Sequence, residues 1–98
     1  MTKELFILEH YGLMPQLKKL AEEHYELTEA CIVAETSSKN TGDITNAMRS
    51  AITEELADVF VLMSQIRQYF GIEQADITNV YAKKVERQLQ RIENEPKQ

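Results

Sequence analysis

Residues 52–63 read ITEELADVFVLM, and this stretch decides the fold that we expect. Its apolar residues recur at steps of three and four, which is the spacing of one face of an α-helix. They are Ile52, Leu56, Val59, Phe60 and Met63. The unbroken apolar run at 59–63 is too short to span a bilayer. The stretch therefore predicts a helix that packs against other helices through one apolar face.

The same spacing continues on both sides of this stretch and divides the chain into four helical segments. We expect a short helix over residues 2–10, a long helix from about 13 to 35, a third from about 44 to 70 and a fourth from about 73 to 94. Residues 36–43 are polar and rich in turn-forming residues, so we expect them to form a loop.

These segments indicate an all-α protein, because the chain has three glycines, two prolines and no alternating strand pattern. We predict a single domain over residues 1–98, an antiparallel helical bundle of three long helices plus a short N-terminal helix. A chain of this length buries only a modest share of its surface alone, so we expect self-association to complete the bundle. The one cysteine, Cys31, has apolar neighbours and is expected to be a buried thiol.

The composition also disfavours several classes of function. A net charge of −5 argues against general nucleic-acid binding, which requires a basic surface. The N-terminal apolar run at residues 5–8 is too short and too acidic in its surroundings for a signal peptide. We therefore expect a cytoplasmic protein with neither a nucleic-acid nor a membrane partner. The sequence also lacks a P-loop, a zinc-protease motif and a nucleophile elbow.

Two groups of acidic residues mark the second and third expected helices, with 28 residues between them. They are Glu22, Glu23 and Glu26 in the first group, and Glu55 and Asp58 in the second. Residues three apart share a helix face, so packing the two helices together would gather four or five carboxylates. Either group alone is also what a solvated helix face carries. Together they predict a hard cation bound through oxygen, such as Mg²⁺.

Basic residues gather in the last expected helix, at Lys83, Lys84, Arg87 and Arg91. They can meet phosphates or pair with acidic neighbours, and the sequence alone favours neither. Mg²⁺ commonly bridges protein carboxylates to the phosphates of a substrate. The combination therefore suggests phosphate-ester or phosphoanhydride chemistry, in which a carboxylate takes a proton from the attacking water.

The pattern Glu22-Glu23-x-x-Glu26, then 28 residues, then Glu55-x-x-Asp58 resembles the signature of the MazG-like, all-α nucleoside triphosphate pyrophosphohydrolases. Flanking segments are similar to those of small, phage-type members, namely His10-Tyr11-Gly12 before the pattern and Lys84-x-x-Arg87 after it. The resemblance runs from about residue 10 to residue 92. It implies Mg²⁺-dependent hydrolysis of a nucleoside triphosphate to the monophosphate and pyrophosphate. It further implies a homodimer or homotetramer that controls or cleans the nucleotide pool.

The resemblance also implies roles for single residues. The positions that match metal ligands are Glu23, Glu26, Glu55 and Asp58. Glu22 matches the leading acid, which would orient or deprotonate the water, so the expected catalytic residues are Glu22 and Glu23. The expected substrate contacts are Lys19, Lys84, Arg87 and His10. Lys19 can instead neutralise a glutamate, and His10 can instead satisfy carbonyl groups at a helix end.

Three questions stay open at this level. Without a tryptophan, stacking on the base would fall to Tyr11, Tyr25 or Tyr81, or to a phenylalanine of a partner chain. One alternative function is the related pyrophosphohydrolase reaction on phosphoribosyl-ATP, which the long polar connection expected at 36–45 disfavours. The other alternative is a non-catalytic helical dimerisation module whose acidic residues only decorate its surface.

Overall fold

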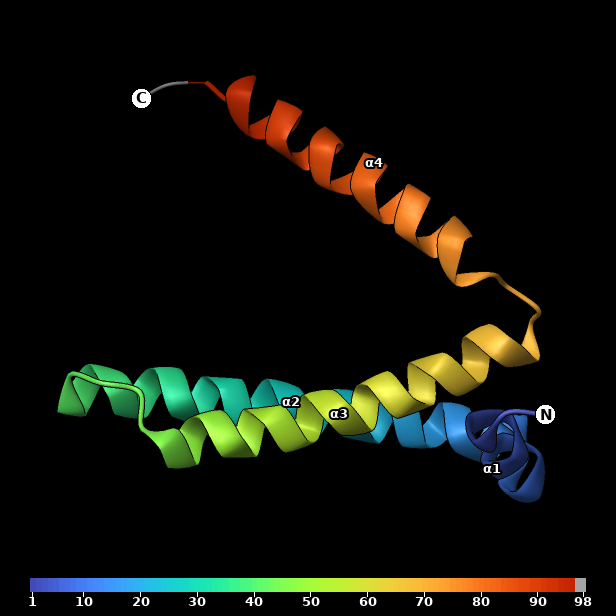
Figure 1. Cartoon of the computed structure of the whole chain (residues 1–98). Coiled ribbons are helices and arrows are strands. Elements are labelled where there is room, and N and C mark those ends of the chain that lie inside the picture. Colours follow the sequence, from blue (N-terminus) through green and yellow to red (C-terminus); the bar gives the residue numbers. More distant parts are fainter. Residues whose placement is uncertain (97–98) are drawn as a thin grey trace.

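The structure is a computed structural model that describes residues 1–96. It consists of four α-helices, and these residues contain no strand (Figure 1). The helices are α1 (Lys3–Tyr11), α2 (Leu13–Thr41), α3 (Asn46–Tyr69) and α4 (Gln74–Glu93). The all-α prediction is confirmed. Within the described range, no helix has the length and apolar character needed to cross a membrane.

Polar caps and glycines set the helix ends. The hydroxyl of Thr45 accepts a hydrogen bond from the backbone N–H of Met48 at 3.2 Å and so begins α3. Gly42 follows α2 in the left-handed conformation, with φ of 86°, and its N–H donates to the carbonyl of Ser38 at 2.6 Å. A side chain at this φ would be strained, so glycine suits the end of this helix.

The prediction of a loop over residues 36–43 is wrong for residues 36–41, because α2 continues to Thr41. Two hydroxyl groups bond back to carbonyl oxygens of the preceding turn: Ser38 to Glu35 at 2.9 Å and Thr41 to Ser37 at 3.0 Å. Lys39 also pairs with Glu35 one turn earlier, at 3.5 Å. The polar side chains are therefore satisfied within the helix, and only residues 42–45 connect α2 to α3.

Helices α2 and α3 lie side by side as an antiparallel pair, and α1 packs across the end of this pair near the chain's N-terminus (Figure 1). The core that they enclose is small. Its buried apolar residues are Leu8 from α1, Ala34 from α2, and Val59 and Leu62 from α3. The stretch at 52–63 therefore contributes half of this core. Of the apolar face predicted from its spacing, Val59 is buried, whereas Leu56, Phe60 and Met63 are exposed, and Leu62 takes a place in the core that the spacing did not predict.

The expected bundle of three long helices does not form within one chain. Helix α4 diverges from the α2–α3 pair after the turn at 70–73 and has no buried residue (Figure 1). A hydrogen bond of 2.7 Å from the Arg67 guanidinium to the carbonyl of Ile72 spans that turn. The apolar seam of α4 is exposed along its whole length. Its residues are Ile77, Val80, Tyr81, Val85, Leu89 and Ile92.

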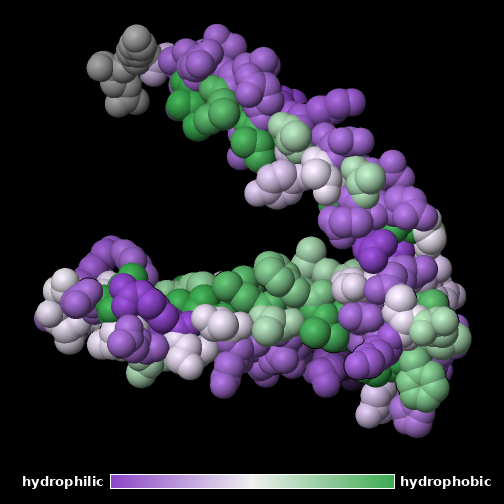
Figure 2. Space-filling model, in the orientation of Figure 1, coloured by the Kyte–Doolittle hydropathy of each residue, from purple (hydrophilic) through white to green (hydrophobic). Residues whose placement is uncertain are grey.

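Hydrophobic surface also covers the face of the α2–α3 pair that is turned toward α4 (Figure 2). Phe60 and Met63 of α3 are more than half exposed there, at 62% and 51%. Cys31 is exposed as well, so the expectation of a buried thiol is wrong. Its apolar neighbours Ile32 and Val33 are exposed too, at 53% and 58%, because this part of α2 has no helix covering it.

We expect Thr45→Ala to lower the free energy of unfolding by about 1 kcal/mol, because the first turn of α3 loses its side-chain cap. Urea denaturation at one fixed protein concentration measures this change. Thr53→Ala is the matched control, since the Thr53 hydroxyl bonds back to Arg49 within the same helix and caps nothing. Equal losses in the two variants would contradict the capping role of Thr45.

Candidate metal centre

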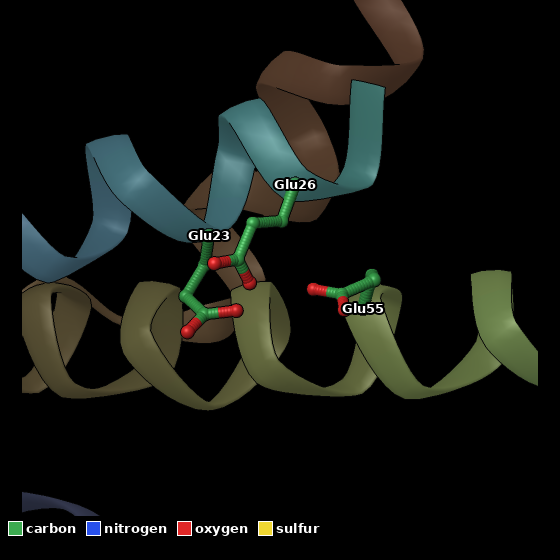
Figure 3. Close-up of side chains that lie close together, drawn as sticks. All are labelled: Glu23, Glu26 and Glu55. Atoms are coloured by element: carbon green, nitrogen blue, oxygen red, sulfur yellow. The ribbon is translucent and has the colours of Figure 1, made fainter. Parts of the chain in front are cut away.

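Three carboxylates meet between α2 and α3. Glu23 and Glu26 point from α2 toward α3, and Glu55 reaches them from α3 (Figure 3). One oxygen of each carboxylate lies within 4.8 Å of the others. Two of the carboxylates share one helix face at a spacing of three residues, as the sequence predicted, and the packing of α2 on α3 brings the third to them.

Two oxygens of this group have no hydrogen-bond partner. Glu23 and Glu55 are half-buried, and the Oε2 atom of each is shielded from solvent without a donor nearby. A buried carboxylate oxygen without a donor or cation is costly, because it has lost its hydration without compensation. A cation bound through oxygen would compensate both atoms at once, so the residues present fit a hard divalent ion.

The crowding also acts on the protonation of Glu23. The pKa of the Glu23 carboxyl is raised from 4.5 to about 7, first by burial and then by the negative charges of Glu26 and Asp58. Without a cation, the group therefore relieves its repulsion by holding a proton at Glu23. A bound divalent ion would displace this proton, since the ionised form is the one that binds metal.

The other two acidic candidates lie at the edge of the centre. Asp58 is close enough for its charge to act on Glu23, but its oxygens do not belong to the set of three that converge. Glu22 is exposed and lies outside the set as well. The structure thus brings together three of the four expected ligands, with Asp58 beside them, and leaves Glu22 on the solvent side of α2.

A hollow of about 270 Å³ opens beside Glu23, between α1, α2 and α3, and we call it the inter-helix hollow. Its rim carries Lys19, Glu23 and Asp58, so Lys19 lies near the acidic group as expected. Tyr11 of α1 also lines it. His10 does not; it is exposed in the last turn of α1, with its ring edge-on to the ring of Tyr11 at 4.7 Å.

The expected phosphate contacts on α4 are separate from the acidic group within one chain. Lys84 and Arg87 are exposed, and among residues 1–96 neither takes part in an ion pair. Lys84 borders a hollow formed by α4 and the turn before it, together with Ile72 and Tyr81. Because α4 diverges from the α2–α3 pair, these two residues reach an acidic group only if another chain presents it.

Two residues that line the inter-helix hollow were not predicted from the sequence. Gln16 and Gln65 are buried, with 6% and 1% of their surface exposed. The spacing of the sequence could have indicated the burial of Gln65, because this residue follows Val59 and Leu62 at steps of three and so falls on the buried face of α3. A polar residue on an apolar stripe is the observation that would have marked it.

Comparison of the chain with protein-family models, with curated proteins and with solved structures gives no match.

The raised pKa of Glu23 predicts how the stability of the metal-free protein depends on pH. The folded state binds the Glu23 proton more tightly than the unfolded chain does. Its stabilising contribution is therefore complete below pH 4.5 and is lost as the pH rises through about 7. Urea denaturation in the presence of a chelator, at pH 5 and at pH 8, should show this loss.

Glu23→Gln should flatten this dependence, because the amide is neutral at both values of pH. Glu54→Gln is the control, since Glu54 is exposed on α3 next to Glu55 and lies outside the acidic group. It should keep the pH dependence of the original chain. Identical pH profiles for the original chain and Glu23→Gln would show that the acidic group stores no repulsion at Glu23.

Proposed function

We propose that this protein is a Mg²⁺-dependent nucleoside triphosphate pyrophosphohydrolase of the cytoplasm. One observation carries the proposal: Glu23 and Glu55, from two helices, belong to a group of three carboxylates, and each has one shielded oxygen without a hydrogen-bond partner. The resemblance of the same acidic pattern to the MazG-like enzymes also supports it. The purpose of the reaction would be to control or clean the nucleotide pool.

Glu23, Glu26 and Glu55 would hold the cation, and Asp58 would supply further negative charge beside it. When bound there, Mg²⁺ would supply positive charge that neutralises phosphate oxygens and activates a water. Glu23 and Asp58 both line the inter-helix hollow, so the proton acceptor is expected at one of these two rather than at Glu22. The water oxygen bonds to phosphorus, the bond to the pyrophosphate oxygen breaks, and the carboxylate takes the proton.

Lys19 would bind a phosphate group, because it shares the rim of the inter-helix hollow with Glu23 and Asp58. A lysine ammonium is a point charge suited to phosphate oxygens. The hollow itself would receive the nucleoside part of the substrate. Tyr11 lies in its wall and could stack on a base, which supports the first of the three tyrosines considered for that role.

Self-association is part of the proposal. The exposed seam of α4 and the hydrophobic face of the α2–α3 pair leave two apolar surfaces without cover in one chain. Such surfaces mark interfaces in soluble proteins. Lys84, Arg87 and Arg91 fall within an arc of about 60° beside the seam. In a homodimer or homotetramer, a second chain that buries the seam would therefore also meet these basic residues at the same interface.

The structure has one feature relevant to each of the two alternatives, the phosphoribosyl-ATP reaction and the dimerisation module. The long polar connection that disfavoured phosphoribosyl-ATP as the substrate is only four residues long, at 42–45, so that compound belongs among the substrates to be tested. The uncovered apolar seam of α4 is also what a helical dimerisation module would show. Such a module would bind no metal, whereas the unpartnered oxygens of Glu23 and Glu55 require compensation.

The deciding experiment measures the products formed from each nucleoside triphosphate and deoxynucleoside triphosphate, from damaged nucleotides and from phosphoribosyl-ATP, with and without Mg²⁺. We expect monophosphate and pyrophosphate in equal amounts, and only with Mg²⁺. Release of orthophosphate would assign a different reaction. Absence of turnover on the whole panel would favour the dimerisation module.

Glu55→Gln should lower kcat/KM by at least about 100-fold, because it removes a direct cation ligand, and even outer-shell changes cost roughly 10- to 100-fold. Loss of Mg²⁺ binding in calorimetry should accompany the loss of activity. Glu54→Gln, one residue away and exposed, should keep both values within about twofold of the original chain. Full activity in Glu55→Gln would remove the metal centre from the mechanism.

Val85→Lys should shift the protein toward the monomer in sedimentation experiments, because it places a charge in the middle of the α4 seam. Gln90→Lys adds the same charge on the opposite side of α4, about 140° away at 100° per residue. It should leave the oligomeric state unchanged. A monomeric original chain at micromolar concentration would contradict the proposed self-association.

A further inference from the structure

Two buried glutamines form the floor of the inter-helix hollow. Gln16 comes from the first turn of α2 and Gln65 from α3, and they face each other across the interface between these helices. The amide nitrogen of Gln16 donates a hydrogen bond of 2.8 Å to the amide oxygen of Gln65. Gln65 has the smallest exposed fraction of any polar residue in the described chain, at 1%.

This single hydrogen bond uses only part of the hydrogen-bonding capacity of the two amides. A glutamine amide carries two N–H donors and one accepting oxygen. Among residues 1–96, neither side chain makes a second hydrogen bond, so the Gln65 NH₂ group and the Gln16 oxygen remain available. Both residues line the inter-helix hollow, so a ligand in the hollow would lie against the pair.

Packing alone does not explain such a pair. Two apolar side chains of the same shape would fill the space at little or no cost in stability, whereas a buried amide with unused donors loses hydration. A neighbouring donor and acceptor are, however, what the edge of a nucleobase requires, since each base presents its own pattern of donors and acceptors. The floor thus has the chemistry to recognise a base.

The surroundings suit the same ligand. Apolar side chains of Ile7, Val61 and Leu62 and the ring of Tyr11 line the hollow, while Glu23 and Lys19 lie at its charged rim. Its volume of about 270 Å³ is just below the range for whole small-molecule sites, roughly 300–1,000 Å³. A single ring system fits this space, with the phosphates left outside at the acidic group.

We propose that Gln16 and Gln65 determine which base the enzyme accepts, by hydrogen bonding to the polar edge of the nucleobase in the inter-helix hollow. This inference rests on the proposed pyrophosphohydrolase function and adds the residues that would set its specificity. The phosphates would be held by the cation and Lys19, so the glutamines would act on the base without touching the reacting atoms.

The test compares base selectivity in the double variant Gln16→Met/Gln65→Met, in which both side chains keep their length but lose their hydrogen-bonding groups. For each protein, kcat/KM is measured with Mg²⁺ for the nucleotide of every base. The selectivity is the kcat/KM of the best nucleotide divided by that of each of the others. A site built to bind a polar group rejects analogues that lack it strongly, so this ratio should fall at least about tenfold. Gln90→Met is the control, since Gln90 is exposed on α4 and lies outside the hollow.

A structural role for the pair would lower kcat/KM for all bases alike and leave the ratio unchanged, which would overturn the inference. A change in the ratio of ribose to deoxyribose substrates, with base ratios unchanged, would overturn it too. In both cases pyrophosphate release by the original chain would stand. If the original chain releases no pyrophosphate from any nucleotide, the proposed function and the inference fail together.

A second measurement needs no variant and covers the case in which the double variant does not fold. The original chain is given the triphosphate of an apolar base isostere, which has the shape of the preferred base without its donors and acceptors. We expect kcat/KM at least about tenfold below that of the natural nucleotide. Equal values would show that the polar edge of the base is not recognised, and would overturn the inference.

Discussion

The repulsion among carboxylates held between α2 and α3 is the constraint on which the rest of the structure depends. Glu23, Glu26 and Glu55 converge within 4.8 Å at the interface that contains most of the small core. The same packing that buries Val59 and Leu62 therefore brings negative charges together. A protonated Glu23 relieves part of this conflict, and a divalent cation would relieve all of it while compensating the two unpartnered oxygens. Binding of a cation would therefore also stabilise the helix pair.

A second constraint is the exposed apolar seam of α4. This helix has a well-formed apolar seam but no partner within the chain, and the exposed face of the α2–α3 pair has none either (Figure 2). Four buried apolar residues make a small core for a chain of 98 residues. Burial of the α4 seam by a second chain would add the missing core. In the proposed dimer, the same contact would also place the basic residues of α4 at the interface.

The helical spacing predicted all four helices and the three-residue pairs of acids, because periodicity and spacing depend only on the local backbone. It did not predict where α2 ends, since hydroxyl groups at Ser38 and Thr41 can bond either to a loop or to their own helix. It also did not show that α4 stands apart: an amphipathic pattern says that a face will be buried, not which chain buries it. Asp58 has the right spacing, but it stays at the edge of the group, because the packing of α3 on α2 decides which side chains meet.

The glutamine pair and the acidic group lie within one hollow, and Glu23 borders both. A ligand that fills the hollow would shield Glu23 further from water, which strengthens its attraction to a cation and raises the cost of leaving it unpaired. Binding of the base and binding of the cation would therefore favour each other, without any change in the helices. If both ligands bind as proposed, this coupling would return the free energy that the empty protein loses by burying Gln16, Gln65 and Glu23.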